Sequence, residues 1–186
     1  MNRRLLITAL GALACAATLA GACGGDDGDG DASGTGASGP GLEDVIYEGG
    51  ATDEALTALL AAAPKVDAAQ AAVLDTPAEG AALPGDPAPE LAWHVGGGGA
   101  RALRPHGDPI NGRAYFLAFS TPERQGVVLV FTTRLTYTPD AAAWATLRAA
   151  GGPITARLVN AVFENNRIAP EGGPFVGGPV TFSIEP

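Results

Sequence analysis

Hydrophobic residues along most of the chain beyond residue 72 alternate with polar or small ones. Because successive side chains of a β-strand point to opposite faces, such alternating positions line one face of a strand. With a short run near Val73, the pattern predicts about seven strands separated by Gly- and Pro-rich turns, as in a β-sandwich. The inward-facing sets are expected to be Leu91, Trp93 and Val95; Tyr115, Leu117 and Phe119; Val127, Leu129 and Phe131; Leu135 and Tyr137; Ile154, Ala156 and Leu158; and Val180, Phe182 and Ile184.

Before these strands the hydrophobic spacing is that of a helix. Thr52 can cap this helix, two acidic residues follow at its positive end, and Pro64 stops it. The helix has one apolar stripe, which is expected to pack against the rest of the domain. The stripe consists of Leu56, Leu59, Leu60 and Ala63.

A second helix is predicted over residues 139–150, between two of the strands. Its start is indicated by Thr138, Pro139 and Asp140 and its end by Gly151, Gly152 and Pro153. The expected fold class is therefore mainly β, a single seven-stranded β-sandwich with a short N-terminal helix and one short inserted helix. Residues 42–72 form the N-terminal helical segment that packs on the sandwich, and residues 73–186 form the sandwich itself.

The first 23 residues have the layout of an export signal. Arg3 and Arg4 precede an uncharged run from Leu5 to Ala20, and small residues then lead to Cys23. The run is shorter than the roughly 20 apolar residues that span a membrane, which favours a secretory signal peptide over residues 1–22. An uncleaved membrane anchor is the alternative.

Residues 20–23, Ala-Gly-Ala-Cys, resemble the lipobox of bacterial lipoproteins, although Ala20 stands where Leu is commonest. The resemblance implies that the signal is removed before Cys23 and that the thiol of Cys23 carries a lipid. Cys15 fits less well, because the bulky Leu13 stands where the family has a small residue. The single Cys left after cleavage cannot form an internal disulfide, and lipidation accounts for it. Several acyl chains on Cys23 would anchor the protein in a membrane.

Gly24 follows this Cys, where Asp would imply retention in the inner membrane by resemblance to enterobacterial sorting. The expected location is therefore the outer membrane, on its periplasmic or its surface face. The lipidated Cys begins a tether over residues 23–41, in which residues 24–41 include 8 Gly and 4 Asp and are predicted to be disordered. Its acidic run does not fit a calcium-binding EF-hand: counting from Asp27, Ala32 and Ser38 stand where Gly and Glu are needed.

Residues 73–186 resemble a fibronectin type III or related immunoglobulin-like domain. Pro77 to Gly80 and Leu91 to Trp93 are similar to the first two strands of that family, with Trp93 as the core Trp of the second strand. The segments 135–137, 154–162 and 179–184 are similar to the fifth, sixth and last strands. The helix at 139–150 replaces a tight turn, and no Arg-Gly-Asp motif is present. With its Gly-rich tether and Ala-rich helix, the whole chain is similar to myxobacterial-type lipoproteins.

The composition of the chain excludes some classes of binding partner. The chain has 20 acidic and 11 basic residues, for a net charge of −9. Nucleic acid is therefore not an expected partner, because its binding depends on Lys and Arg placed against phosphates. An aromatic content of 6% is low for a surface that stacks on sugars or single-stranded bases.

Motifs for cofactors and metals are incomplete. The loop Gly96–Gly99 lacks the Lys and Ser or Thr of a phosphate-binding loop, and it lacks the third Gly of a dinucleotide-binding loop. His94, His106 and Asp108 do not have the spacing of a preformed zinc site. No cofactor and no metal ion are predicted.

Catalytic motifs are also incomplete. Ser120 lacks the G-x-S-x-G turn that presents a nucleophile, and Glu164 and Glu171 have no separation that the sequence fixes. The protein is not expected to be an enzyme. A hydrolase or metal-dependent enzyme whose motifs are not evident in the sequence remains the least favoured alternative.

Two long loops are the candidate binding surface. Residues 96–112 and 164–178 follow the second and sixth expected strands, which end on the same side of such a sandwich. Long loops on a rigid scaffold often carry function. The alternative is that Phe175 packs on the core and the loops are merely long. The candidate binding residues are Arg101, Arg104, His106, Asp108, Asn165, Asn166, Arg167 and Phe175.

These observations favour a lipid-anchored protein of the cell envelope whose β-sandwich is a non-enzymatic binding or structural module. Its partners are expected to be the membrane, through the lipid, and envelope polysaccharide or protein. The domain is expected to be monomeric. The alternative is an accessory subunit that docks a larger envelope protein complex through a sheet edge or through its N-terminal helix.

Overall fold

Two long antiparallel strands, β5 (Gly112–Ser120) and β8 (Ile154–Glu164), form the centre of the larger of two sheets. They pair over nine consecutive positions, from Gly112 opposite Phe163 to Ser120 opposite Thr155. The computed structural model describes residues 44–96 and 108–186, and in these ranges the chain is mainly β, as the sequence predicted.

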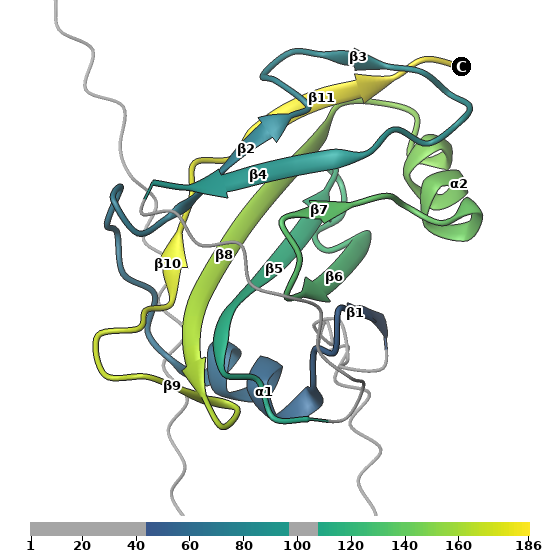
Figure 1. Cartoon of the computed structure of the whole chain (residues 1–186). Coiled ribbons are helices and arrows are strands. Elements are labelled where there is room, and N and C mark those ends of the chain that lie inside the picture. The colour runs from purple at the N-terminus through teal and green to yellow at the C-terminus, as the bar shows by residue number, and fades with distance from the viewer. Residues whose placement is uncertain (1–43, 97–107) are drawn as a thin grey trace, which may run out of the picture. The chain divides into compact units, whose positions relative to one another are not determined.

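The rest of the larger sheet is built outward from this pair (Figure 1). Its eight strands include the order β1-β6-β5-β8-β11-β3, and two short strands, β9 and β10, also pair with β8. The outer pairs β1–β6 and β11–β3 are parallel. The bounds are β1 Val45–Glu48, β3 Ala82–Leu83, β6 Val128–Thr132, β9 Arg167–Ile168, β10 Phe175–Val176 and β11 Val180–Ile184.

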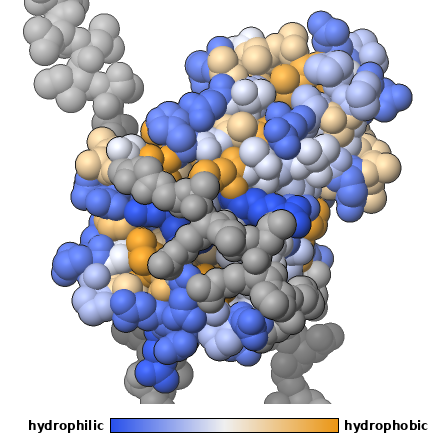
Figure 2. Space-filling view, viewed as in Figure 1, coloured by the Kyte–Doolittle hydropathy of each residue, from blue (hydrophilic) through white to orange (hydrophobic). Residues whose placement is uncertain are grey.

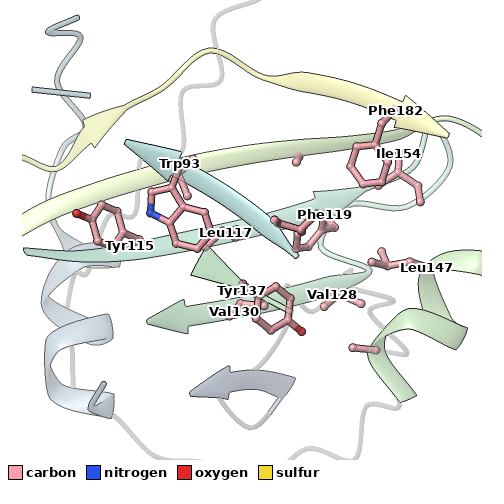
Figure 3. Close-up of a cluster of buried hydrophobic side chains, with 14 of the residues drawn as sticks. Trp93, Tyr115, Leu117, Phe119, Val128, Val130, Tyr137, Leu147, Ile154 and Phe182 are labelled. Atoms are coloured by element: carbon pink, nitrogen blue, oxygen red, sulfur yellow. The ribbon is translucent and has the colours of Figure 1, made fainter. Parts of the chain in front are cut away.

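A three-stranded antiparallel sheet covers one face of the larger sheet. It has the order β2-β4-β7 and consists of β2 (Ala72–Thr76), β4 (Leu91–Val95) and β7 (Thr136–Tyr137). Figure 3 shows the side chains between the two sheets, where the rings of Trp93 and Tyr115 meet edge to face at 5.6 Å between centroids. The main hydrophobic core also contains Leu91, Leu117, Phe119, Val128, Val130, Tyr137, Ile154, Leu158 and Phe182.

The helix α2 (Ala141–Ala149) closes one end of this core. The helix begins within the predicted start, Thr138 to Asp140: its N-cap is Asp140, whose carboxylate accepts a hydrogen bond from the backbone N–H of Ala143. Leu147 and Trp144 are buried, and the indole Nε1 of Trp144 donates to the carbonyl of Gly85 at 2.8 Å. This bond ties the helix to the chain between β3 and β4.

The opposite face of the larger sheet is covered at one end by α1 (Asp53–Ala61). Thr52 is its N-cap, as predicted. Ala114 and Ala161 lie directly opposite each other on β5 and β8 and are fully buried. Their small side chains leave room for the helix, which packs through Leu56 and Leu59. The cluster also contains Ala51, Ala55, Ile110, Phe131 and Phe163.

Burial raises the pKa of three core tyrosines. The pKa of Tyr47 rises to about 12, through burial and through the nearby Asp53 carboxylate. Burial also raises the pKa of Tyr115, with a smaller opposing effect of Arg113, and it raises the pKa of Tyr137. These phenols therefore remain neutral at physiological pH and serve as packing groups.

The strand count differs from the sequence prediction. The described ranges contain eleven strands, not about seven, because β1, β3, β9 and β10 are short additions to the larger sheet. β1 lies inside the segment 42–72, which was expected to be helical. Its pairing with β6 is parallel and joins residues that are far apart in the sequence, so local patterning gives little sign of it.

Two predicted apolar faces are corrected. Val128 and Val130, rather than Val127, Leu129 and Phe131, face the core between the sheets. All five residues of β6 are buried, so its two faces cannot be told apart by hydrophobicity. In the N-terminal helix, Leu60 and Ala63 are exposed instead of buried: Leu60 lies on the outer side of the last turn of α1, and Ala63 comes after the helix has ended at Ala61.

Leu56→Ala is expected to lower the free energy of unfolding of a soluble chain of residues 24–186 by about 2–4 kcal/mol, because it leaves a cavity beneath α1. Leu60→Ala on the same helix is the matched control and is expected to change it by less than about 1 kcal/mol. Urea denaturation followed by circular dichroism measures both. Equal losses would contradict the described packing of α1.

Candidate functional site

The chain just before β5 and the turn just after β8 are bonded to each other. The backbone N–H of Asn165 donates to Oδ1 of Asn111 at 2.9 Å, and the N–H of Ile110 donates to Oδ1 of Asn166 at 2.7 Å. The N–H of Asn166 also donates to the carbonyl of Ile110. We call Asn111, Asn165 and Asn166 the asparagine latch. It brings the described part of the first candidate loop against the second candidate loop.

The backbone of the turn explains why it contains asparagines. Asn165 has φ 49° and Asn166 has φ 62°, so both residues are left-handed. Two successive left-handed residues form the tight turn that suits the twist of a β-hairpin, and Asn tolerates this conformation better than most residues. The side-chain oxygens of Asn165 and Asn166 accept hydrogen bonds within the latch, so these two candidate residues stabilise the conformation of the loop end.

A hollow of about 490 Å³ lies between the segment after α1 and the connection from β9 to β10, which belongs to the second candidate loop. Its apolar lining comes from Val66, Val162, Ala169, Pro170 and Phe175, and its polar lining includes Lys65, Asp67, Gln70 and Glu171. Nζ of Lys65 lies 3.0 Å from Oε2 of Glu171, with side-chain exposures of 46% and 93%. An ion pair this exposed contributes little to stability and can open for a ligand.

One wall of the hollow includes Gln70, which is held by a hydrogen-bonded group that we call the polar clamp, consisting of Gln70, Arg113 and Asn160. Asn160 is fully buried. Its Oδ1 accepts from the N–H of Ala72 at 2.7 Å, and its Nδ2 donates to the carbonyl of Gln70 at 3.0 Å.

Arg113 completes the clamp from the neighbouring strand. Its Nη1 donates to the carbonyl of Gln70 and its Nη2 to Oε1 of the same residue, both at 3.0 Å. Buried polar groups are stable only when they are hydrogen-bonded in this way. The clamp therefore attaches the segment before β2 to the larger sheet and gives the hollow a rigid side.

The candidate residues from the sequence are distributed unevenly over this end. Cys23, Arg101, Arg104 and His106 lie outside the described residues. Asp108 and Arg167 are exposed, the first before the latch and the second at the start of β9.

Phe175 was expected on the binding surface and is instead 4% exposed. It lies opposite Asn160 in the pairing of β10 with β8, which turns it into the protein, and it adds only a small area to the lining of the hollow. The packing alternative for this residue therefore holds.

The sequence reasoning missed Lys65, Gln70 and Asn160. A usable signal existed for Asn160, because it continues the inward set Ile154, Ala156 and Leu158 at the same spacing of two. A polar residue at an inward position of a strand must find a buried partner. Its partner lies 90 residues away in the sequence, and no local pattern identifies it.

Other polar side chains lie apart from the hollow. As expected, His94 points outward, and its Nδ1 lies 2.8 and 2.9 Å from the two carboxylate oxygens of Asp75. Oγ of Ser120 accepts a hydrogen bond from the N–H of Gly126. Within residues 44–96 and 108–186, no group of three or more His, Cys, Asp or Glu side chains is arranged to hold a metal ion.

Comparison with known proteins gives no relative: no family model, no curated protein and no solved structure matches the chain. In the part of the chain that the structure describes, no helix is long and apolar enough to cross a membrane.

Asn160→Ala is expected to lower the free energy of unfolding by about 1–3 kcal/mol, because the N–H of Ala72 is then buried without its acceptor. Gln70→Ala is the matched control: it removes one side-chain contact with Arg113 but keeps the backbone carbonyl that Asn160 binds, and a smaller loss is expected. Urea denaturation of both variants measures the difference. If Gln70→Ala is the more damaging change, Asn160 is not the main support of the clamp.

Proposed function

We propose that this protein is a lipid-anchored protein of the cell envelope whose β-domain presents a non-enzymatic binding surface at its loop end. The observation that carries the proposal is that the second candidate loop, which the asparagine latch joins to the first, also lines a hollow with an apolar lining and a charged rim. Such a concave surface on a rigid scaffold suits recognition. The proposed ligand is an envelope polysaccharide or an envelope protein.

We further propose that residues 73–186 are a variant of the fibronectin type III or immunoglobulin-like sandwich. Strand order supports this proposal. An immunoglobulin-type sandwich has strands A, B and E in one sheet and C, F and G in the other, with C′ beside C in some members. The order β2-β4-β7 corresponds to A-B-E, and the order β6-β5-β8-β11 corresponds to C′-C-F-G. Trp93 lies in the central strand of the smaller sheet, as the resemblance implies.

The anchor is proposed from the sequence alone. The signal peptide over residues 1–22, Cys23 and the Gly- and Asp-rich tether over residues 23–41 support it. Gly24 supports the outer membrane as the destination. We propose a monomeric domain that binds neither a cofactor nor nucleic acid.

Cys23→Ser is expected to abolish the incorporation of radiolabelled palmitate into the protein expressed in a Gram-negative host, because the thiol that would carry the lipid is gone. Cys15→Ser is the matched control and is expected to leave incorporation unchanged. Gel fluorography of the purified proteins gives the result. Labelling that survives Cys23→Ser would refute the lipid anchor.

A titration tests the binding surface. Peptidoglycan fragments and envelope polysaccharide are added to a soluble chain of residues 24–186, and amide resonances are followed by NMR. Shifts are expected at Lys65, Asp108, Asn165, Arg167 and Glu171. If these resonances stay unchanged with every saccharide, polysaccharide recognition is wrong and a protein partner is favoured.

A matched pair of variants completes that titration. Arg167→Ala is expected to weaken binding roughly tenfold, the effect of losing one hydrogen bond to a charged group. Arg124→Ala should leave the affinity unchanged, because Arg124 is exposed in the turn between β5 and β6, at the other end of these strands.

A further inference from the structure

The chain leaves α1 through an exposed run of apolar residues. We call residues 60–66 the apolar strip; they read Leu-Ala-Ala-Ala-Pro-Lys-Val. Leu60 is 54% exposed and Val66 is 94% exposed, and in the described ranges Val73 is the only other large hydrophobic residue that is exposed. The single charge of the strip, on Lys65, is balanced by Glu171.

Such a run is unusual for an otherwise well-packed domain. On the face in Figure 2, hydrophobic residues form small patches separated by hydrophilic ones. Consecutive exposed apolar residues are disfavoured on a protein surface unless they contact something. The strip therefore has the composition of a contact surface.

The strip begins at the end of the domain where the chain enters the described structure. The first strand, β1, and the helix α1 pack into the same hydrophobic cluster, through Val45 and Tyr47 on one side and Leu56 and Leu59 on the other. Leu60 follows directly in the last turn of α1. Figure 1 shows α1 at one end of the domain and α2 at the other.

The length of the preceding chain limits how the domain can be held. If Cys23 carries the lipid, residues 24–44 separate the membrane from β1. A flexible chain of that length has an end-to-end distance of about 25 Å. A compact unit of the size of residues 38–186 has a diameter of roughly 35–40 Å. If the proposed tether has this average length, the start of β1 lies within about one domain width of the lipid, which favours an orientation with the entry end toward the membrane.

We propose that the apolar strip rests on the surface of the membrane that holds the anchor, with Leu60 and Val66 at the lipid interface and Lys65 beside the headgroup phosphates. This inference rests on the proposed function, because it requires the anchor at Cys23. Two aliphatic side chains bind a bilayer only weakly by themselves, but the anchor keeps them at a high local concentration.

The orientation also narrows the range of ligands that fit the loop end. Lys65 and Val66 belong both to the strip and to the lining of the hollow. A strip at the lipid interface therefore brings one edge of the hollow to the level of the headgroups. A ligand of the hollow is then bound at the surface of the membrane.

Fluorescence quenching in the lipidated protein tests the contact. Cleavage removes Cys15 and the lipid occupies the thiol of Cys23, so Val66→Cys supplies the one free thiol for an environment-sensitive fluorophore. Ala145→Cys, exposed on α2, is the matched control. The proteins are placed in phosphatidylcholine vesicles with brominated acyl chains. The label at position 66 is expected to be quenched roughly twofold more than the label at 145, as for a group at the acyl boundary.

A second substitution ties the effect to the strip. Leu60→Ser in the Val66→Cys protein is expected to reduce the quenching, whereas Thr57→Ser, exposed on the same helix, is expected to leave it unchanged. Equal quenching at 66 and 145 overturns the inference. A second result also overturns it: the label at position 66 is shielded from water in the absence of vesicles, to a degree that increases with protein concentration. In that case a second copy of the chain covers the strip.

The same samples separate this inference from the proposed anchor. Protein that does not float with the vesicles refutes the anchor, and the membrane contact with it. Protein that floats while position 66 stays in water refutes the membrane contact alone.

Discussion

The register of β5 against β8 is the constraint on which the other parts of the domain depend. A shift by one residue would turn every side chain of these strands to the other face. In the observed register, Ala114 faces Ala161 where α1 packs, and Leu117 lies opposite Leu158 where the smaller sheet packs. The same register ends at Gly112 and Phe163. It therefore determines where the residues of the asparagine latch emerge and meet.

A buried polar residue is placed on this pair of strands, at the edge of the core. Asn160 would be unfavourable there without partners, and it obtains them from Gln70, before β2, and from Ala72, the first residue of β2. The smaller sheet is thereby held at one defined position along the larger one. The hollow is bounded by this rigid clamp on one side and by an exposed ion pair on the other, so it combines a fixed wall with a rim that can open. That combination supports the proposed recognition surface.

Local signals in the sequence predicted much of the fold. Thr52 and Asp140 cap the two helices because their side chains bond backbone groups only three residues away. The alternation around Trp93, Tyr115 and Phe182 predicted the core between the sheets, because that core has solvent-facing residues on the outer side of most strands. The alternation predicted the wrong inward face for β6, because both faces of this strand are covered. The alternation also did not predict β1, because the strand with which β1 pairs is more than 80 residues away in the sequence.

The candidate site was less predictable than the fold. By itself the sequence determined the mainly β class and both helix starts, because each follows from residues close together in the chain. It also carries the lipobox-like segment on which the proposed anchor rests. The tertiary structure alone decided that Phe175 is buried, that Asn160 binds the segment before β2, that Lys65 reaches Glu171 and that the asparagines join two loops. The hydrogen bonds of Lys65, Asn160 and Asn166 join residues 56 to 106 positions apart, and Phe175, besides its pairing with Asn160, bridges to Lys65 at the other side of the hollow. Their approach is set by the register of the central strands, which no short stretch of sequence contains.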